Sequence, residues 1–205
     1  MGKVIEINAE KLDKMAAYIE DFPEEKEKEI EIKSAILKDG SCNYSYELLH
    51  GLTKGDELAR KGVHIVHDDM YTAFKQLDVF FAHIDGAFHW ANNQTHIDDL
   101  EAHEDMNKFS VYAFKITGSE ENRSVIISGN KDTTIGAVSY NSPKIKLVDG
   151  GTYLYIEELR NRLKVVIEQV EAYMNGKTAP QYEQLSMDFD SAGGDDSDFD
   201  NAKVE

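Results

Sequence analysis

Three stretches of the chain place apolar residues at the three- or four-residue spacing of an amphipathic helix. They cover residues 9–21, residues 70–84 and residues 152–174. Asn8 precedes the first stretch, and Asp68 and Asp69 precede the second, where N-caps are expected. Gly176 follows the third stretch and is the kind of residue that ends a helix. The pattern therefore predicts three helices.

Between these stretches, apolar and polar residues alternate at the two-residue period of a β-strand. Residues 30–36 and 44–48 alternate on either side of Asp39-Gly40, which predicts a β-hairpin. Further strands are expected at residues 109–117, 123–128 and 133–140, with a short one at 145–147. Turns are expected at Gly118 and at Gly129-Asn130. The remaining segments, residues 51–62 and 91–107, are predicted to be loops.

The elements follow one another in the order α-β-β-α-β-β-β-α. Strands and helices that are segregated in this way are typical of the α+β class. We expect an antiparallel sheet of about five strands packed against two or three helices, because the helical stripes need an apolar surface to cover. Helices and strands together form a single predicted domain over residues 1–176.

The charge of the chain is unusual and is concentrated near its C-terminal end. The 205 residues carry 39 acidic and 22 basic side chains, a net charge of −17. Residues 181–205 contain eight acids and one lysine, and they are rich in Ser, Gly and Asp. Such a segment cannot bury enough apolar surface to offset its ordering entropy. Residues 177–205 are therefore predicted to be a disordered acidic tail.

Composition also excludes several classes of protein. Cys42 is the only cysteine, so neither a disulfide within the chain nor a cysteine-rich zinc site is expected. It lies beside the predicted hairpin turn and has no basic neighbour in sequence that would make it a nucleophile. No uncharged run approaches the ~20 residues of a membrane span. Residues 1–6 contain no apolar signal region, so we expect a cytoplasmic protein without a membrane partner.

Residues 184–189 carry the strongest functional signal, because Gln-Leu-Ser-Met-Asp-Phe resembles the bacterial sliding-clamp binding peptide. The hexapeptide form of that peptide reads Gln-Leu-x-Leu-x-Phe. Gln184, Leu185 and Phe189 match it directly, and Met187 replaces leucine conservatively. The resemblance implies that Met187 and Phe189 fill an apolar pocket of the clamp and that Gln184 fixes the register. The alternatives are a segment that packs back on its own domain and a chance match within the tail.

The acidic residues that follow, 195–200, resemble the tails of single-strand DNA-binding proteins. Those tails end in an aromatic or apolar tip that partner proteins recognise. Here Phe199 is internal and the chain ends in Val204-Glu205, so the resemblance does not extend to the tip. A solubilising role for this part of the tail is the simpler interpretation.

A local basic region lies on the predicted strands between residues 108 and 146, with six basic and three acidic side chains. A basic sheet with exposed aromatic rings is typical of a surface that binds single-stranded DNA. Tyr112 and Phe114 share a strand with Ile116, which favours a core position for them. The candidate nucleic-acid-binding residues are therefore the cations Lys115, Arg123, Lys131, Lys144 and Lys146.

All seven histidines fall between His50 and His103, and several are followed by acids. Histidine and carboxylate ligands suit zinc, manganese or iron, which makes a metal-dependent hydrolase the rival hypothesis. None of the helical two-histidine zinc motifs is present. Capping of helix ends explains such histidines more simply, with His67 as a candidate cap for the helix that follows it. We expect no metal and no cofactor.

Two further stretches resemble, in style, uncharacterised proteins from bacteriophage DNA replication and recombination modules. They are residues 63–69, which lead into the second helix, and residues 141–145, before the third. The resemblance implies an accessory, non-enzymatic role in the host cytoplasm. The sliding clamp and single-stranded DNA are the expected partners. A host-takeover or anti-defence protein, which occupies the clamp or mimics nucleic acid with its negative charge, is a third hypothesis.

Overall fold

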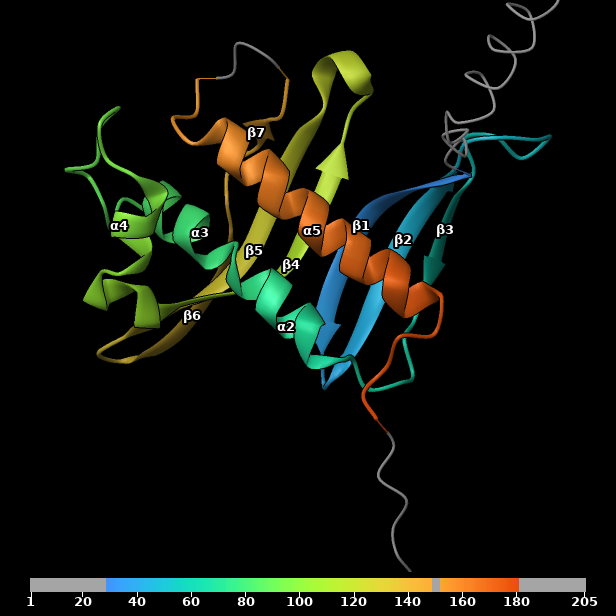
Figure 1. Cartoon of the computed structure of the whole chain (residues 1–205), viewed down its shortest axis with the longest axis horizontal. Helices are drawn as coiled ribbons and strands as arrows, with labels where there is room; N and C mark the ends of the chain where they lie inside the picture. Colours follow the sequence, from blue (N-terminus) through green and yellow to red (C-terminus); the bar gives the residue numbers. More distant parts are fainter. Residues whose placement is uncertain (1–28, 149–151, 181–205) are drawn as a thin grey trace, which may run out of the picture.

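A seven-stranded antiparallel sheet forms the body of the molecule, and its helices cover one face (Figure 1). The computed structural model describes residues 29–148 and 152–180. The strands are β1 (Ile30–Lys38), β2 (Ser41–Leu48), β3 (Glu57–Arg60), β4 (Phe109–Thr117), β5 (Ser124–Thr133), β6 (Gly136–Asn141) and β7 (Ile145–Lys146). The helices are α2 (Asp68–Lys75), α3 (Asp78–Ile84), α4 (Ile97–Glu101) and α5 (Ile156–Met174), with 3-10 turns η1 (Glu104–Lys108) and η2 (Glu120–Asn122).

The strand order is β3-β2-β1-β4-β5-β6, and β7 pairs with β5 beyond the end of β6. The predicted hairpin is confirmed: β1 and β2 pair around Asp39 and Gly40. Both residues have positive φ, of 52° and 77°, which the Asp-Gly sequence tolerates at a tight turn. The α+β class with an antiparallel sheet is likewise confirmed, with more strands than the sequence pattern predicts.

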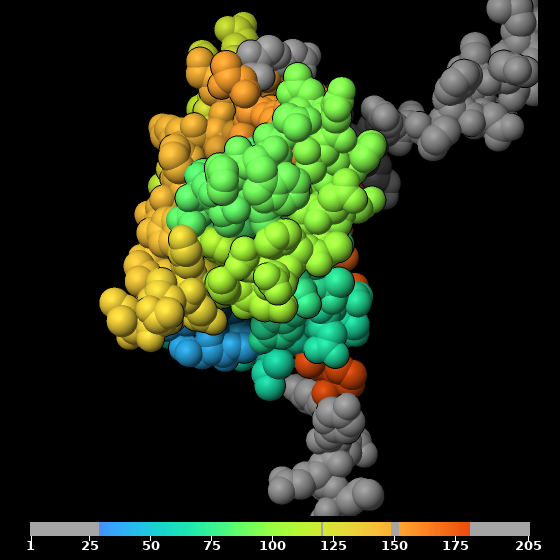
Figure 2. Space-filling model, turned by 90° about the vertical axis from the view of Figure 1, so that its left-hand side faces the viewer, coloured from blue at the N-terminus to red at the C-terminus, as the bar shows by residue number. Residues whose placement is uncertain are grey.

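The core lies between the sheet and the helices. The stripe of α5 predicted from sequence is buried, as Leu159, Leu163, Val166 and Val170 show. Phe74 of α2 packs against Phe114 of β4, with ring centroids 6.1 Å apart. Burial of each such side chain stabilises the fold by roughly 1.5–3 kcal/mol. At one end of the sheet, α3, α4 and η1 form the cover, shown in green in Figure 2.

The helix predicted over residues 70–84 is instead two helices, because contacts from distant residues interrupt it. The N–H groups of Gln76 and Leu77 bond to carbonyls three residues back, which closes α2. The carbonyl of Gln76 accepts a hydrogen bond from Arg162 of α5. The buried carboxylate of Asp78 then accepts the N–H of Val111 on β4, at 2.6 Å, and α3 begins at that residue.

The turn predicted at Gly129-Asn130 is also wrong, since β5 continues through both residues to Thr133. Gly129 lies opposite a bulge in β4, where the ring of Phe81 covers the strand. A Cβ at this position would lie 2.7 Å from Cε1 of Phe81 and 2.8 Å from the carbonyl oxygen of Ser110. The glycine therefore serves close packing, and the turn comes later, where Thr133 bonds to Gly136.

The two segments predicted to be loops contain short elements without a long apolar repeat. Residues 57–60 form β3 at the edge of the sheet, and residues 91–107 include α4 and most of η1.

The helix predicted at residues 9–21 and the tail from residue 181 lie outside the described residues. The body continues past the expected boundary at Gly176, because the N–H of Ala179 donates to the carbonyl of Ile65 at 2.9 Å.

Candidate functional site

The sheet opens between its two halves. β1 and β4 pair over only three residues of each strand, from Ser34 opposite Lys115 to Ile36 opposite Ala113. Beyond Ser34 and Lys115 the strands diverge, and α5 crosses the gap between them (Figure 1). An open groove of about 980 Å³ lies here. We call it the split-sheet groove.

The walls of the split-sheet groove come from both halves of the sheet and from α5. The apolar lining includes Ile30 and Ile32 of β1, Ile116 of β4, and Leu163 and Ile167 of α5. Charged side chains stand among them. The cations are Lys33, Lys54, Arg123, Arg160 and Lys164, and the acids are Glu31, Glu47 and Glu171. The lining therefore carries more cations than acids, in a chain whose net charge is −17.

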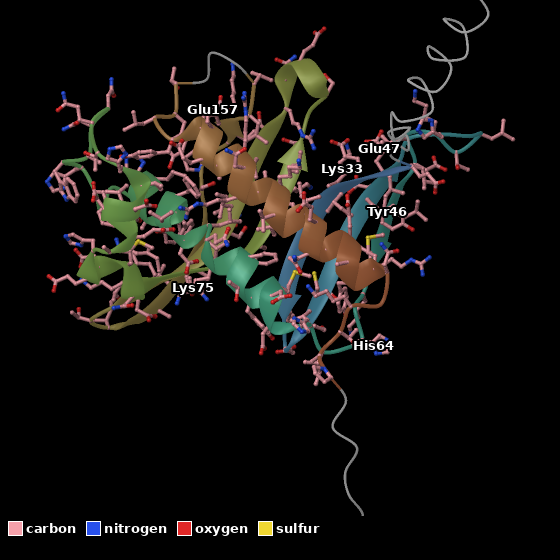
Figure 3. The ribbon with its side chains drawn as sticks, viewed as in Figure 1. Lys33, Tyr46, Glu47, His64, Lys75 and Glu157 are labelled. Atoms are coloured by element: carbon pink, nitrogen blue, oxygen red, sulfur yellow. The ribbon has the colours of Figure 1, made fainter. Side chains whose placement is uncertain are left out.

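Ion pairs span the opening. The Nζ atom of Lys33 lies 2.5 Å from Glu31 and 2.6 Å from Glu47, on the neighbouring strand. Figure 3 shows Lys33 and Glu47 side by side. Arg123, which precedes β5, reaches across to Glu31 at 2.5 Å. The chain Glu47–Lys33–Glu31–Arg123 therefore ties the two halves of the sheet together where their backbones do not pair.

This network forms because β1 has a bulge. The register between β1 and β2 shifts by one residue between Ile32 and Ser34, and Lys33 is the extra residue. Burial opposes the charge of Lys33, but hydrogen bonds to Glu31 and Glu47 outweigh it and raise the pKa of Lys33 above its ordinary value. The Lys33 side chain is 15% exposed and stays charged between its two carboxylates.

The other cations of the groove differ in whether they form ion pairs. Within the part of the chain that the structure describes, Lys54 and Lys164 have no ion-pair partner. Arg160 donates to the carbonyl of Leu147 and pairs with Glu157. Exposed lysines can attract an anionic group of a ligand. The apolar lining beside them can contact the uncharged part of the same ligand. The groove therefore offers two exposed cations, Lys54 and Lys164, beside aliphatic side chains.

The structure separates the predicted nucleic-acid-binding residues. Arg123 lines the split-sheet groove, and Lys115 is exposed where β1 and β4 diverge. Lys144 and Lys146 are exposed on either side of the buried Ile145 of β7. Lys131 lies outside the groove lining, where it pairs with Asp85 and stands over the ring of Phe109. Lys115, Lys144 and Lys146 are exposed and have no ion-pair partner among the described residues, whereas Arg123 and Lys131 are each paired with an acid.

The aromatic residues of these strands mostly serve the core. Phe114 is 1% exposed, which confirms the core position favoured by its strand neighbours. The ring of Tyr140 stacks on Phe81, and its hydroxyl donates to Asp85 at 2.6 Å. Tyr112, at the bulge of β4, is half-buried. Among the described residues, no Phe, Tyr or Trp lines the split-sheet groove, so a ligand there has no ring on which to stack.

The histidines, all of which the structure describes, occupy separate structural positions. The Nδ1 atom of His67 accepts the N–H of Asp69 and caps α2, as expected. His103 caps η1 in the same way. Burial lowers the pKa of His83, whose ring packs against Tyr153 and Tyr155. Over residues 29–148 and 152–180, no three His, Cys, Asp or Glu side chains are grouped to hold a metal ion.

Cys42 is fully buried on β2, facing the helices. Burial raises the pKa of its thiol to about 12. The thiolate is the reactive form of cysteine, so this residue is a core side chain at neutral pH.

Comparison of the chain with protein-family models, curated proteins and solved structures gives no match. None of the helices that the structure describes is both long and apolar enough to cross a membrane. The predicted clamp-binding residues Gln184, Leu185, Met187 and Phe189 lie outside the described residues. The last described residue, Pro180, precedes Gln184 by four positions.

Proposed function

We propose that this chain is an accessory protein of DNA replication or recombination. Residues 184–189 bind the bacterial sliding clamp, and the body binds single-stranded DNA through the cations around the split-sheet groove. The observation that carries the proposal is the hexapeptide, in which Gln184, Leu185, Met187 and Phe189 occupy the positions of the clamp-binding pattern.

The position of the hexapeptide supports docking on a partner. It follows the body by a few residues, and its apolar side chains stand among acids and polar residues that solvate the rest of the tail. A short peptide of this kind binds in a preformed groove, where a few anchors supply most of the affinity. Ordering of the segment opposes binding, so we expect a dissociation constant on the order of micromolar.

The charges of the body support contact with phosphate. Lys54 and Lys164 line the groove without an ion-pair partner among the described residues, and Arg123 lines it beside Glu31. Because this surface offers cations and aliphatic side chains, it can hold a DNA backbone without reading the bases. Such binding is independent of sequence and weakens steeply with salt.

Attachment to the clamp would compensate for weak DNA binding. A second contact made by a tethered module is intramolecular, with an effective concentration in the millimolar range for a short flexible linker. A body of modest DNA affinity would therefore be held on the strand wherever the clamp is loaded.

Calorimetry of the hexapeptide against the clamp tests the first half of this function. Met187→Ala and Phe189→Ala should each remove most of the binding, since each loses apolar burial of roughly 1.5–3 kcal/mol. Ser186→Ala is the matched control and should be nearly silent. Undetectable binding at high micromolar peptide, or equal effects of the Ser186 and Phe189 changes, would refute clamp docking.

Fluorescence anisotropy with a labelled oligothymidine at low salt tests the second half. The double variant Lys54→Gln and Lys164→Gln should weaken binding and flatten its salt dependence. Lys75→Gln is the matched control, since Lys75 lies on α2, away from the groove (Figure 3). Equal losses in the two variants, or no binding by the parent, would refute a DNA site in the groove. Clamp binding without DNA binding would favour the host-takeover hypothesis.

A further inference from the structure

One edge of the sheet is exposed along its length and carries no charge. β6 lies at this edge (Figure 1), and within residues 29–148 and 152–180 no strand pairs with its outer side. Five of its six residues are exposed, among them Val138 at 48%. Residues 133–143 contain no Asp, Glu, Lys or Arg. Proteins commonly protect a sheet edge with charged side chains, proline or a bulge, and β6 has none of these.

The opposite edge of the sheet is protected. β3 has only four residues, and two of them, Glu57 and Arg60, are charged and exposed. A chain with a net charge of −17 repels its own copies over most of its surface. Of the two strands at the ends of the sheet, β6 is therefore the one on which a second copy meets no like charge.

The free backbone groups of β6 belong to alternate residues. The N–H of Ser142 donates to the carbonyl of Ile127 at 2.7 Å, so Ser142 bonds towards β5. The register between β5 and β6 is regular. In an antiparallel ladder, residues that bond to the neighbouring strand alternate with residues that point away from it. Ala137, Ser139 and Asn141 therefore present their N–H and carbonyl groups outwards.

These outward groups match those of a second copy. When two β6 strands run antiparallel with their Ser139 residues opposite each other, all three outward residues of each strand pair, in about six hydrogen bonds. Val138 then lies opposite Tyr140 of the second copy. Tyr140 stacks on Phe81 and donates to Asp85, so its ring is a fixed surface that covers the exposed Val138. An aromatic and a β-branched residue form a favourable cross-strand pair.

From these observations we propose that the protein forms a symmetric dimer through β6, in which two sheets join edge to edge about a two-fold axis at Ser139. An interface made by one pair of strands is small, so we expect a dissociation constant on the order of 10–100 micromolar. None of the described residues that line the split-sheet groove lies on β6, so the groove stays open in the dimer. The dimer therefore does not depend on the proposed function.

Sedimentation equilibrium of the whole chain tests the dimer, which the parent should form over this concentration range. Val138→Glu should weaken it by roughly ten-fold or more, because it places like charges across the interface. Lys131 lies opposite Val138 on β5, so the monomer tolerates the new carboxylate. Val165→Glu is the matched control, since Val165 is 37% exposed on α5, and it should dimerise like the parent.

Disulfide trapping tests the register of the two strands. Ser139→Cys should give a covalent dimer on mild oxidation, because residues that face each other across the axis have Cα atoms about 5.5 Å apart. Ser110→Cys is the control, since Ser110 is also exposed but lies on β4, inside the sheet, and it should stay monomeric. Cys42 is buried and does not contribute to the cross-link.

A parent that stays monomeric at several hundred micromolar would overturn the proposal and leave the edge of β6 to a strand of another protein. Equal dimerisation by the two glutamate variants would also overturn it, because the dimer would then form through a different surface. Equal cross-linking by the two cysteine variants would refute the pairing about Ser139.

Discussion

Replacement of Asp78 by asparagine should stabilise the protein increasingly as pH rises. Asp78 begins α3, is 7% exposed, and accepts the N–H of Val111 at 2.6 Å. Burial raises the pKa of its carboxyl to about 7, and the hydrogen bond from Val111 and the charge of Lys75 offset part of that rise. An asparagine at this position has no proton to lose, and its carbonyl oxygen can accept the same bond.

The magnitude follows from the difference between the folded and unfolded pKa values. An unfolded aspartate titrates near about 3.9, and each pKa unit corresponds to about 1.4 kcal/mol. Between that value and about 7, the folded state holds a proton that the unfolded state has released, so the free energy of unfolding falls as pH rises. From pH 5 to pH 8, the advantage of Asp78→Asn over the parent should grow by about 3 kcal/mol.

Urea unfolding of the parent and the variants at pH 5 and pH 8 measures this difference. Asp78→Ala should cost about 1–3 kcal/mol at pH 5, because it leaves the buried N–H of Val111 without a partner. Asp105→Asn is the control of opposite sign, since a hydrogen bond from Lys108 lowers the pKa of Asp105 and its charge favours folding. The reasoning fails if Asp78→Asn loses stability at pH 8, as the Asp105 variant is expected to do.

Three further changes test other parts of the structure. Gly129→Ala should destabilise the fold by about 1–3 kcal/mol through its clash with Phe81, and an unchanged urea midpoint would contradict that packing. Glu31→Gln should lower the melting temperature more than Glu157→Gln, because Glu31 is 26% and Glu157 68% exposed, and equal shifts would contradict a bridging role. The Cys42 thiol should react with a thiol reagent at pH 8 only after unfolding, and rapid labelling of the native protein would contradict its burial.

Local signals predicted the parts of the fold that depend on neighbouring residues. The Asp39-Gly40 turn sets the β1–β2 hairpin, and the long apolar stripe of α5 needs nothing beyond its own period. The failures involve distant contacts. The break between α2 and α3 depends on the hydrogen bond between Asp78 and Val111, which are 33 residues apart in the chain. Gly129 lies in a strand, although glycine is typical of turns, because the ring of Phe81 leaves no room for a side chain there.

The split-sheet groove was missed for the same reason. The hairpin begins with Lys38 opposite Ser41, a register that would place Glu31 opposite Leu48. The bulge at Lys33 shifts the register and brings Glu31 opposite Glu47, with Lys33 between the two carboxylates. The alternation of Glu31 and Lys33 on one strand was visible in the sequence. The bulge, and the partner Arg123 on the other side of the opening, were not.

Displacement of a fluorescent clamp-binding peptide by the whole chain tests the central claim most directly. The 205-residue protein should release the peptide from a bacterial sliding clamp at concentrations on the order of micromolar. Ser186→Ala should compete like the parent, and Phe189→Ala should fail to compete, because only the latter loses an apolar anchor. Failure of the parent to displace the peptide, or equal competition by the two variants, would contradict the account.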